Sequence, residues 1–139
     1  MACLCITDAW GADVYLRTAQ NANNATGNYD NPPAAHKFSE TSTDVYTLEI
    51  TTSTMSYSSD NFYFRVRVSG WNDQICPSEN NHQLVVGGDP YGYAYNSNGR
   101  KDFTFTLLKS DVEKYSTITI KVNVGSNTAN RKIEVLNVD

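Results

Sequence analysis

The sequence predicts an all-β domain, an antiparallel, immunoglobulin-like β-sandwich with about seven strands. Short segments of alternating apolar and polar residues recur along the chain, and clusters of Gly, Asn, Asp and Ser separate them. No segment sustains the 3.6-residue periodicity of an amphipathic helix. With 139 residues the chain has the usual length of one domain. Residues 1–139 are therefore expected to form one domain with its core at about 13–136.

The first strand is expected over residues 13–18. Val14 and Leu16 point to one side of this segment, and Tyr15 and Arg17 point to the other. A second strand is expected over residues 45–51, where the residues predicted to be buried are Tyr46, Leu48 and Ile50.

The strongest alternation lies in residues 62–69. Its apolar face carries Phe62, Phe64, Val66 and Val68. Its opposite face carries Tyr63, Arg65 and Arg67. Because side chains in a strand alternate between the two faces, this pattern predicts a strand with one buried side.

Shorter elements complete the expected fold. Further strands are expected over 83–86, 103–107, 117–124 and 131–135. The sequence also allows one helical turn within 109–115, which Ser110 could cap with Glu113 three residues later. Residues 19–36 contain repeated Asn and a Pro-Pro pair, which predict a long loop outside the core.

The composition narrows the range of partners. The formal net charge is −4, the pI is about 5.0, and no basic stripe stands out, so nucleic acid is not an expected partner. The mean hydropathy is −0.48 and no apolar run approaches the roughly 20 residues of a membrane-spanning helix. Richness in Asn, Ser, Thr and Tyr, with 19% charged residues, is typical of a secreted or cell-surface domain. Residues 1–6 do not form a signal peptide, which suggests a domain excised from a longer multidomain protein.

The cysteines and histidines do not form a metal-binding pattern. Structural zinc requires four N or S ligands, and only His36 and His82 are available beside Cys3, Cys5 and Cys76. Cys76 can pair with Cys3 or with Cys5, and the sequence does not choose between them. We expect no metal and no cofactor, although Asn- and Asp-rich loops leave a bound calcium ion open.

Catalysis is not expected. The chain has no Gly-x-Ser-x-Gly motif to present a serine nucleophile, and both histidines have the polar flanks of surface residues. A small glycosidase remains an alternative, since it needs only a pair of carboxylates at a separation that the sequence does not give.

The loop after the strongest strand is the leading candidate for a binding site. Trp71 stands there beside Asn72 and Asp73, immediately after the strand that carries Arg65 and Arg67. An exposed indole can stack on the C–H face of a sugar while amide, carboxylate and guanidinium groups bind its hydroxyls. This combination predicts a carbohydrate platform. The alternative is that Trp71 is buried and closes one end of the sandwich.

Tyrosines supply further candidate contacts. Tyr91 and Tyr93 alternate with Tyr95 within residues 89–96, so an extended segment would show three rings to one side. Tyr29 lies in the long loop at 19–36. The alternative is a half-buried edge strand, because β-sheets are rich in Tyr without any ligand.

Four segments in this order carry a family resemblance. They are Val14-Tyr15-Leu16-Arg17, Val45-Tyr46-Thr47-Leu48, Phe62-Tyr63-Phe64-Arg65-Val66 and Gly70-Trp71-Asn72. This succession, over about residues 13–124, resembles the repeating domains of SusE/SusF-type starch-binding proteins and related surface glycan-binding modules. The resemblance implies a β-sandwich that binds an α-glucan, located at the bacterial outer membrane.

The resemblance also implies roles for particular residues. Trp71 would be one aromatic platform, Arg65 or Arg67 would replace the usual lysine, and Tyr29 would stand at the first-loop aromatic position. The sequence thus predicts non-catalytic binding of a starch-like polysaccharide. The rival hypothesis is a structural or adhesive spacer module of a surface protein, possessing no sugar site.

Overall fold

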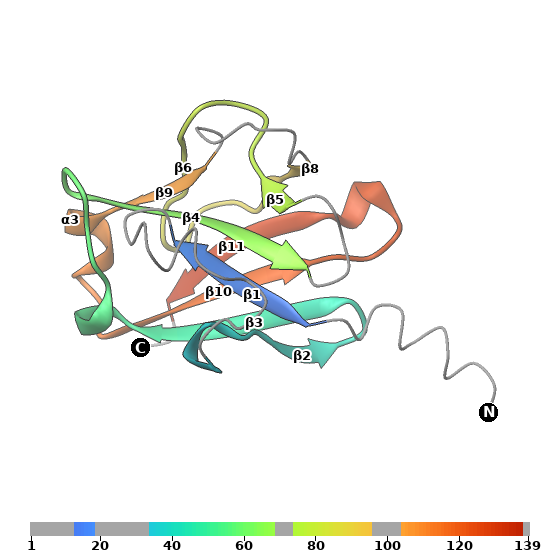
Figure 1. Ribbon diagram of the computed structural model, residues 1–139, viewed down its shortest axis with the longest axis horizontal. Helices are drawn as coiled ribbons and strands as arrows, with labels where there is room; N and C mark the ends of the chain where they lie inside the picture. Colours follow the sequence, from blue (N-terminus) through green and yellow to red (C-terminus); the bar gives the residue numbers. More distant parts are fainter. Residues whose placement is uncertain (1–12, 19–33, 69–73, 96–103, 138–139) are drawn as a thin grey trace.

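The computed structural model describes residues 13–18, 34–68, 74–95 and 104–137. These residues form an all-β sandwich of two sheets, which confirms the predicted fold class. Figure 1 shows β1 and β4 in one layer and β3, β10 and β11 in the other.

The first sheet has six strands. In spatial order these are β6 (His82–Gln83), β9 (Phe105–Leu108), β4 (Asn61–Val68), β5 (Gln74–Cys76) and β8 (Ala94–Tyr95), and β1 (Val14–Thr18) pairs with β4 as well. The second sheet has five strands in the order β2 (Ser39–Ser42), β3 (Val45–Thr51), β10 (Thr117–Asn123), β11 (Lys132–Asn137) and β7 (Tyr91–Gly92).

The sheets contain more than the seven strands expected. The additional strands, β2, β5, β7 and β8, have two to four residues each, which is too short to show an alternating pattern. The expected strand at 83–86 is reduced to β6, and Val86 forms an isolated bridge with Val135. The pair β6–β9 is parallel, whereas the other strand pairs are antiparallel.

In the described part of the chain, four short helical segments lie between strands. They are η1 (Ala34–His36), η2 (Thr52–Thr54), α3 (Lys109–Val112) and η3 (Thr128–Asn130). The helical turn expected within 109–115 is present as α3, but Ser110 does not cap it. The helix begins at Lys109, and its N-cap residue is Leu108, which makes no side-chain capping bond.

The core lies between the two sheets. Phe62, Phe64, Val66 and Val68 of β4 are all buried, as their alternation predicts. Facing them from the second sheet are Tyr46 and Leu48 of β3 and the isoleucines and valines of β10 and β11. The rings of Phe62, Phe64 and Phe105 pack in series, with centroids 5.9 Å and 5.4 Å apart.

Three of the sequence predictions concern membrane-spanning helices, cysteine pairing and metal ions. Within the described ranges, no helix has the length and apolar character needed to span a membrane. Cys76 is buried in β5, while Cys3 and Cys5 lie outside the described residues. The described part of the chain also contains no group of three or more His, Cys, Asp or Glu side chains arranged to hold a metal ion.

Candidate functional site: an arginine cluster on the first sheet

Three arginines meet on the outer face of the first sheet. Strand β1 runs antiparallel to β4, and the register places Arg17 directly opposite Arg65. Arg67 lies two residues further along β4, on the same face. Side chains directly opposite each other have Cβ atoms about 5 Å apart, and residues i and i+2 of one strand are about 7 Å apart. We call Arg17, Arg65 and Arg67 the arginine cluster.

The side chains of the arginine cluster are partly shielded from solvent. Arg65 has only 7% of its surface exposed, and Arg17 and Arg67 are half-buried. Thr104 and Thr106, the neighbouring outward residues next to and within β9, are buried too. Burial lowers the pKa of Arg17 from its ordinary value, and the positive charges of Arg65 and Arg67 lower it further. All three arginines also have interactions within the protein.

Two tyrosines flank the cluster. Tyr15 lies opposite Arg67, and Tyr63 precedes Arg65 by two residues on β4. The Tyr15 hydroxyl donates a hydrogen bond of 3.1 Å to Asp13, which also pairs with Lys37 at 3.1 Å. Burial and this bond to Asp13 raise the pKa of Tyr15. Both rings are half-buried, so the outer face combines guanidinium groups with partly exposed aromatic surface.

Half of the predicted site residues lie outside the described part of the chain. These are Trp71, Asn72, Asp73 and Tyr29. Residues 69–73 follow directly on Val68, the last residue of β4. Their part in a site stays a prediction.

The tyrosines at 91 and 93 do not form one row of rings. Tyr91 belongs to β7 in the second sheet, whereas β8, three residues later, belongs to the first sheet, so the chain crosses between sheets. Tyr93 has 9% of its surface exposed and donates a hydrogen bond of 2.8 Å to the carbonyl oxygen of Asn123. Residues 91–95 are therefore not one continuous strand, and the Tyr93 hydroxyl is bonded within the protein.

Tyr91 is held by its neighbours. Its ring lies 4.0 Å from the imidazole of His82 and meets Phe105 edge to face at 5.9 Å. Its hydroxyl accepts a hydrogen bond of 3.3 Å from the backbone N–H of Ser78. His82 in turn lies 2.6 Å from Glu79, measured from Nδ1 to Oε2. These contacts fix Tyr91 against the first sheet.

Arg17 was absent from the residues predicted to form the site. The direction of Arg17 could be predicted from the sequence, because alternation along 13–18 places it on the side opposite Val14 and Leu16. Its position beside Arg65 could not, because that depends on the pairing of β1 with β4. These strands are separated by more than 40 residues, so periodicity alone does not reveal that they are neighbours.

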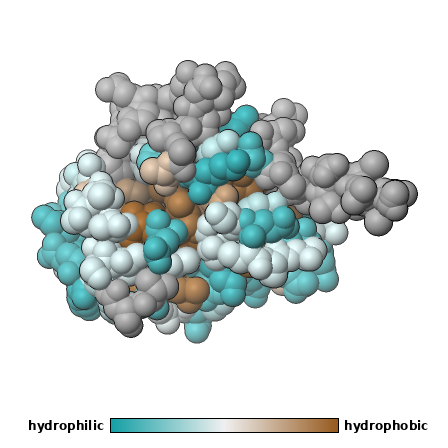
Figure 2. All heavy atoms as spheres, turned by 90° about the horizontal axis from the view of Figure 1, so that it is seen from below, coloured by the Kyte–Doolittle hydropathy of each residue, from teal (hydrophilic) through white to brown (hydrophobic). Residues whose placement is uncertain are grey.

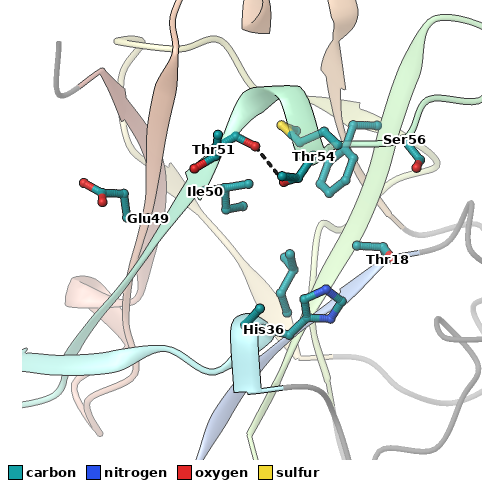
Figure 3. A pocket seen from close by; sticks show the side chains of 11 residues that line it. Thr18, His36, Glu49, Ile50, Thr51, Thr54 and Ser56 are labelled. Carbon is teal, nitrogen blue, oxygen red and sulfur yellow. Dashed lines mark hydrogen bonds between the residues drawn. The ribbon is translucent and has the colours of Figure 1, made fainter.

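A separate pocket of about 370 Å³ opens beside β1 and β3 (Figure 3). Its apolar lining comes from Leu16, Ile50, Met55 and Phe62. The polar lining includes Thr18, His36 and Glu49, and burial lowers the pKa of His36 from its ordinary value of 6.5. The Thr18 hydroxyl is buried and has no hydrogen-bond partner.

Figure 2 shows hydrophobic side chains at the centre of the face seen from below, bordered by polar ones.

Comparisons with known proteins do not assign this chain to a family. No protein-family model, no curated protein and no solved structure matches this chain. The relation to SusE/SusF-type domains therefore stays a prediction from the sequence, and the site has to be interpreted from its own chemistry.

Proposed function

We propose that this chain is a non-catalytic carbohydrate-binding domain that holds a polysaccharide against the outer face of β1 and β4. The observation that supports this proposal most is the register that sets Arg17 opposite Arg65, beside Arg67 and Tyr15. Guanidinium groups offer several N–H donors in a fixed plane, and tyrosine rings offer apolar surface for the C–H face of a sugar. Both kinds of group come from a rigid sheet, which lowers the entropic cost of binding.

Residues 69–73 fit this proposal by their position in the sequence. They follow Val68, the last residue of β4, the strand that carries Arg65 and Arg67. Trp71, Asn72 and Asp73 would then extend the binding surface beyond the strand. The sequence resemblance suggests a starch-like α-glucan as the ligand and the bacterial cell surface as the location.

The absence of catalysis is part of the proposal. Glycoside hydrolysis ordinarily needs two carboxyl groups that flank the scissile bond. Within the described strands β1, β4 and β9, the outward side chains are Arg, Tyr, Thr, Asn and Leu, and none is a carboxylate. Asp13, immediately before β1, is paired with Lys37. This composition suits binding better than bond cleavage.

Affinity gel electrophoresis tests the proposal. Native gels containing amylopectin, pullulan, xylan, β-glucan or an acidic polysaccharide are each run with the wild-type protein, and we expect at least one of them to retard it. Arg67→Gln should weaken that retardation about tenfold, since it removes a charge-assisted contact. Lys132→Gln is the matched control, because it removes one positive charge from an exposed position of the second sheet. Tyr93→Phe should bind like the wild type.

The rival spacer hypothesis predicts the opposite results. A spacer would migrate at the same rate in every gel, and its Trp71 would be inaccessible to solvent. Acrylamide quenching of Trp71 in a Trp10→Phe variant measures that access, since Trp10 and Trp71 are the two tryptophans of the chain. Equal migration in all gels, acidic ones included, would overturn the carbohydrate proposal.

A further inference from the structure

The pocket beside β1 and β3 lies between the two sheets, away from the arginine cluster. β1 belongs to the first sheet and β3 to the second, and both contribute side chains to its lining. Leu16 and Thr18, on the inward side of β1, are buried, whereas Arg17 points to the opposite face. The volume of about 370 Å³ falls in the range of about 300 to 1,000 Å³ that is typical of small-molecule sites. A ligand in this pocket would therefore lie on the other side of β1 from the arginine cluster.

The floor of this pocket is apolar. Leu16 and Phe62 belong to the hydrophobic core, and Ile50 and Met55 are half-buried and pack against it. Covering such a floor with apolar ligand atoms is favourable, because it removes apolar surface from water. The floor therefore favours a ligand with an apolar face.

Polar groups without partners lie around this floor. The Thr18 hydroxyl is buried and has no hydrogen-bond partner. The imidazole of His36 and the carboxylate of Glu49 form no hydrogen bond or ion pair with any described residue either. Figure 3 shows His36 and Thr18 at one side of the pocket and Glu49 at the other. Because a shielded polar group without a partner raises the free energy of the folded protein, a ligand with hydrogen-bonding groups is favoured over a purely apolar one.

The charges around the pocket favour a neutral ligand. Glu49 is the one charged side chain of the described lining, which contains no lysine or arginine. Burial lowers the pKa of His36 from 6.5, so its imidazole is neutral at about pH 7. An anionic ligand would meet the negative charge of Glu49 without a cation to pair with. A cationic ligand would gain little, because Glu49 is exposed and water screens its charge.

We infer that this pocket binds one pyranose ring of a neutral sugar. A pyranose combines an apolar C–H face with hydroxyl groups that both donate and accept hydrogen bonds. Its C–H face covers Ile50 and Met55, and its hydroxyl groups bond to the imidazole of His36 and the carboxylate of Glu49. The ligand class rests on the proposed function, and the pocket adds a second sugar contact on the inner side of β1.

An NMR titration of the whole chain tests this inference. The ¹³C–¹H methyl signals of Leu16, Ile50 and Met55 report on the pocket, and the methyl signals of Val112, which is fully buried outside the pocket, are the control. The probes are methyl α-glucopyranoside, methyl β-galactopyranoside and N-acetylglucosamine. We expect at least one of these neutral sugars to shift the pocket signals in a saturable manner while those of Val112 stay in place.

Two further probes separate sugar recognition from simpler kinds of binding. Cyclohexanol has a six-membered ring with a single hydroxyl group, and glucuronate adds a carboxylate to a pyranose. Cyclohexanol leaves polar groups of the pocket unpaired, and glucuronate meets the charge of Glu49. Each should bind at least about threefold more weakly than the best neutral sugar.

Variants identify the residues that bind the hydroxyl groups. Glu49→Gln should weaken binding of the best neutral sugar at least about threefold, because it removes a charged acceptor, and His36→Ala should have an effect of similar size. Glu113→Gln is the matched control, because it removes an exposed carboxylate outside the pocket. Thermal unfolding checks that each variant folds, and the comparison of probes needs only the wild-type protein.

The outcomes distinguish this inference from the proposed function. Unchanged pocket signals with every sugar would overturn the pocket site and leave the outer face of β1 and β4 to the gel experiment. Binding of cyclohexanol or of glucuronate as strong as that of the best neutral sugar would also overturn the inference, since the first indicates a merely apolar pocket and the second contradicts a neutral ligand. Saturable pocket shifts with a sugar, together with equal migration in every polysaccharide gel, would support this site and overturn binding at the outer face.

Discussion

Arg65 is a charged side chain on the outward face of a strand that is nevertheless buried. It stands on the outer side of β4, where alternation places it, yet it is almost fully buried. A charged group loses several kcal/mol of hydration when it is buried, so it needs compensating partners. Arg65 has interactions of this kind within the protein.

His36 offers a measurable effect at the residue scale. Burial holds the pKa of His36 in the folded protein below 6.5, the ordinary value that applies to the unfolded chain. As the pH falls below 6.5, the unfolded chain takes up the proton first, so the free energy of unfolding decreases. The stability that comes from the neutral imidazole is present above pH 6.5 and is lost as the pH falls through the folded pKa.

Urea unfolding at a series of pH values between about 8 and about 5 measures this effect. The decrease below pH 6.5 should be smaller in His36→Gln than in the wild type. Glu49, which lines the same pocket, is kept in both proteins. Parallel pH profiles for the two proteins would show that His36 is not responsible.

At the element scale, alternation predicted the long strands and missed the short ones. The expected segments at 13–18, 45–51 and 117–124 match β1, β3 and β10 to within a residue at each end. Strands of two or three residues, such as β7 and β8, contain at most one apolar-polar alternation, so they exist through tertiary pairing and not through a local pattern.

The candidate site was predictable only in part for the same reason. The outward direction of Arg65 and Arg67 follows from the sequence of β4 alone. Their meeting with Arg17 depends on the pairing of β1 with β4, which are separated in the sequence by β2 and β3 of the other sheet, and the burial of Arg65 depends on its surroundings in the fold. Tyr93 became structural because a carbonyl oxygen of β10 lies within reach of its hydroxyl, which no local pattern indicates.

The central role of β4 predicts a large effect of a core substitution. Phe64 is fully buried and packs against both Phe62 and Phe105. Phe64→Ala should lower the free energy of unfolding by about 3 to 5 kcal/mol, through lost apolar burial and the cavity left behind. Urea denaturation measures the change.

Val85→Ala is the control for this prediction. Val85 has 51% of its surface exposed, so its truncation should change the free energy of unfolding by less than about 0.5 kcal/mol. Similar losses in Phe64→Ala and Val85→Ala would contradict the assignment of Phe64 to the core.

At the scale of the whole molecule, the hydrophobic core and the proposed binding face lie on opposite sides of the first sheet. The apolar faces of the two sheets form the core, while the outward face of the first sheet carries the arginine cluster. Ligand contacts on that face can vary without disturbing the core, which is typical of β-sandwich modules with different ligands. The net charge of −4 limits non-specific attraction to polyanions, and the arginine cluster is a local concentration of positive charge.

NMR of the arginine side chains tests the central claim most directly. A short malto-oligosaccharide, a soluble fragment of the α-glucan that the sequence resemblance suggests, is titrated into the ¹⁵N-labelled protein, and the Nε–Hε signals are followed. Arg131 is the internal control, because its Nε donates a hydrogen bond of 2.6 Å to the carbonyl oxygen of Gly125, in the loop between β10 and β11. We predict that the signals of Arg17, Arg65 and Arg67 shift in a saturable manner while that of Arg131 stays in place. Unchanged signals from the arginine cluster, or equal shifts at Arg131, would contradict the account.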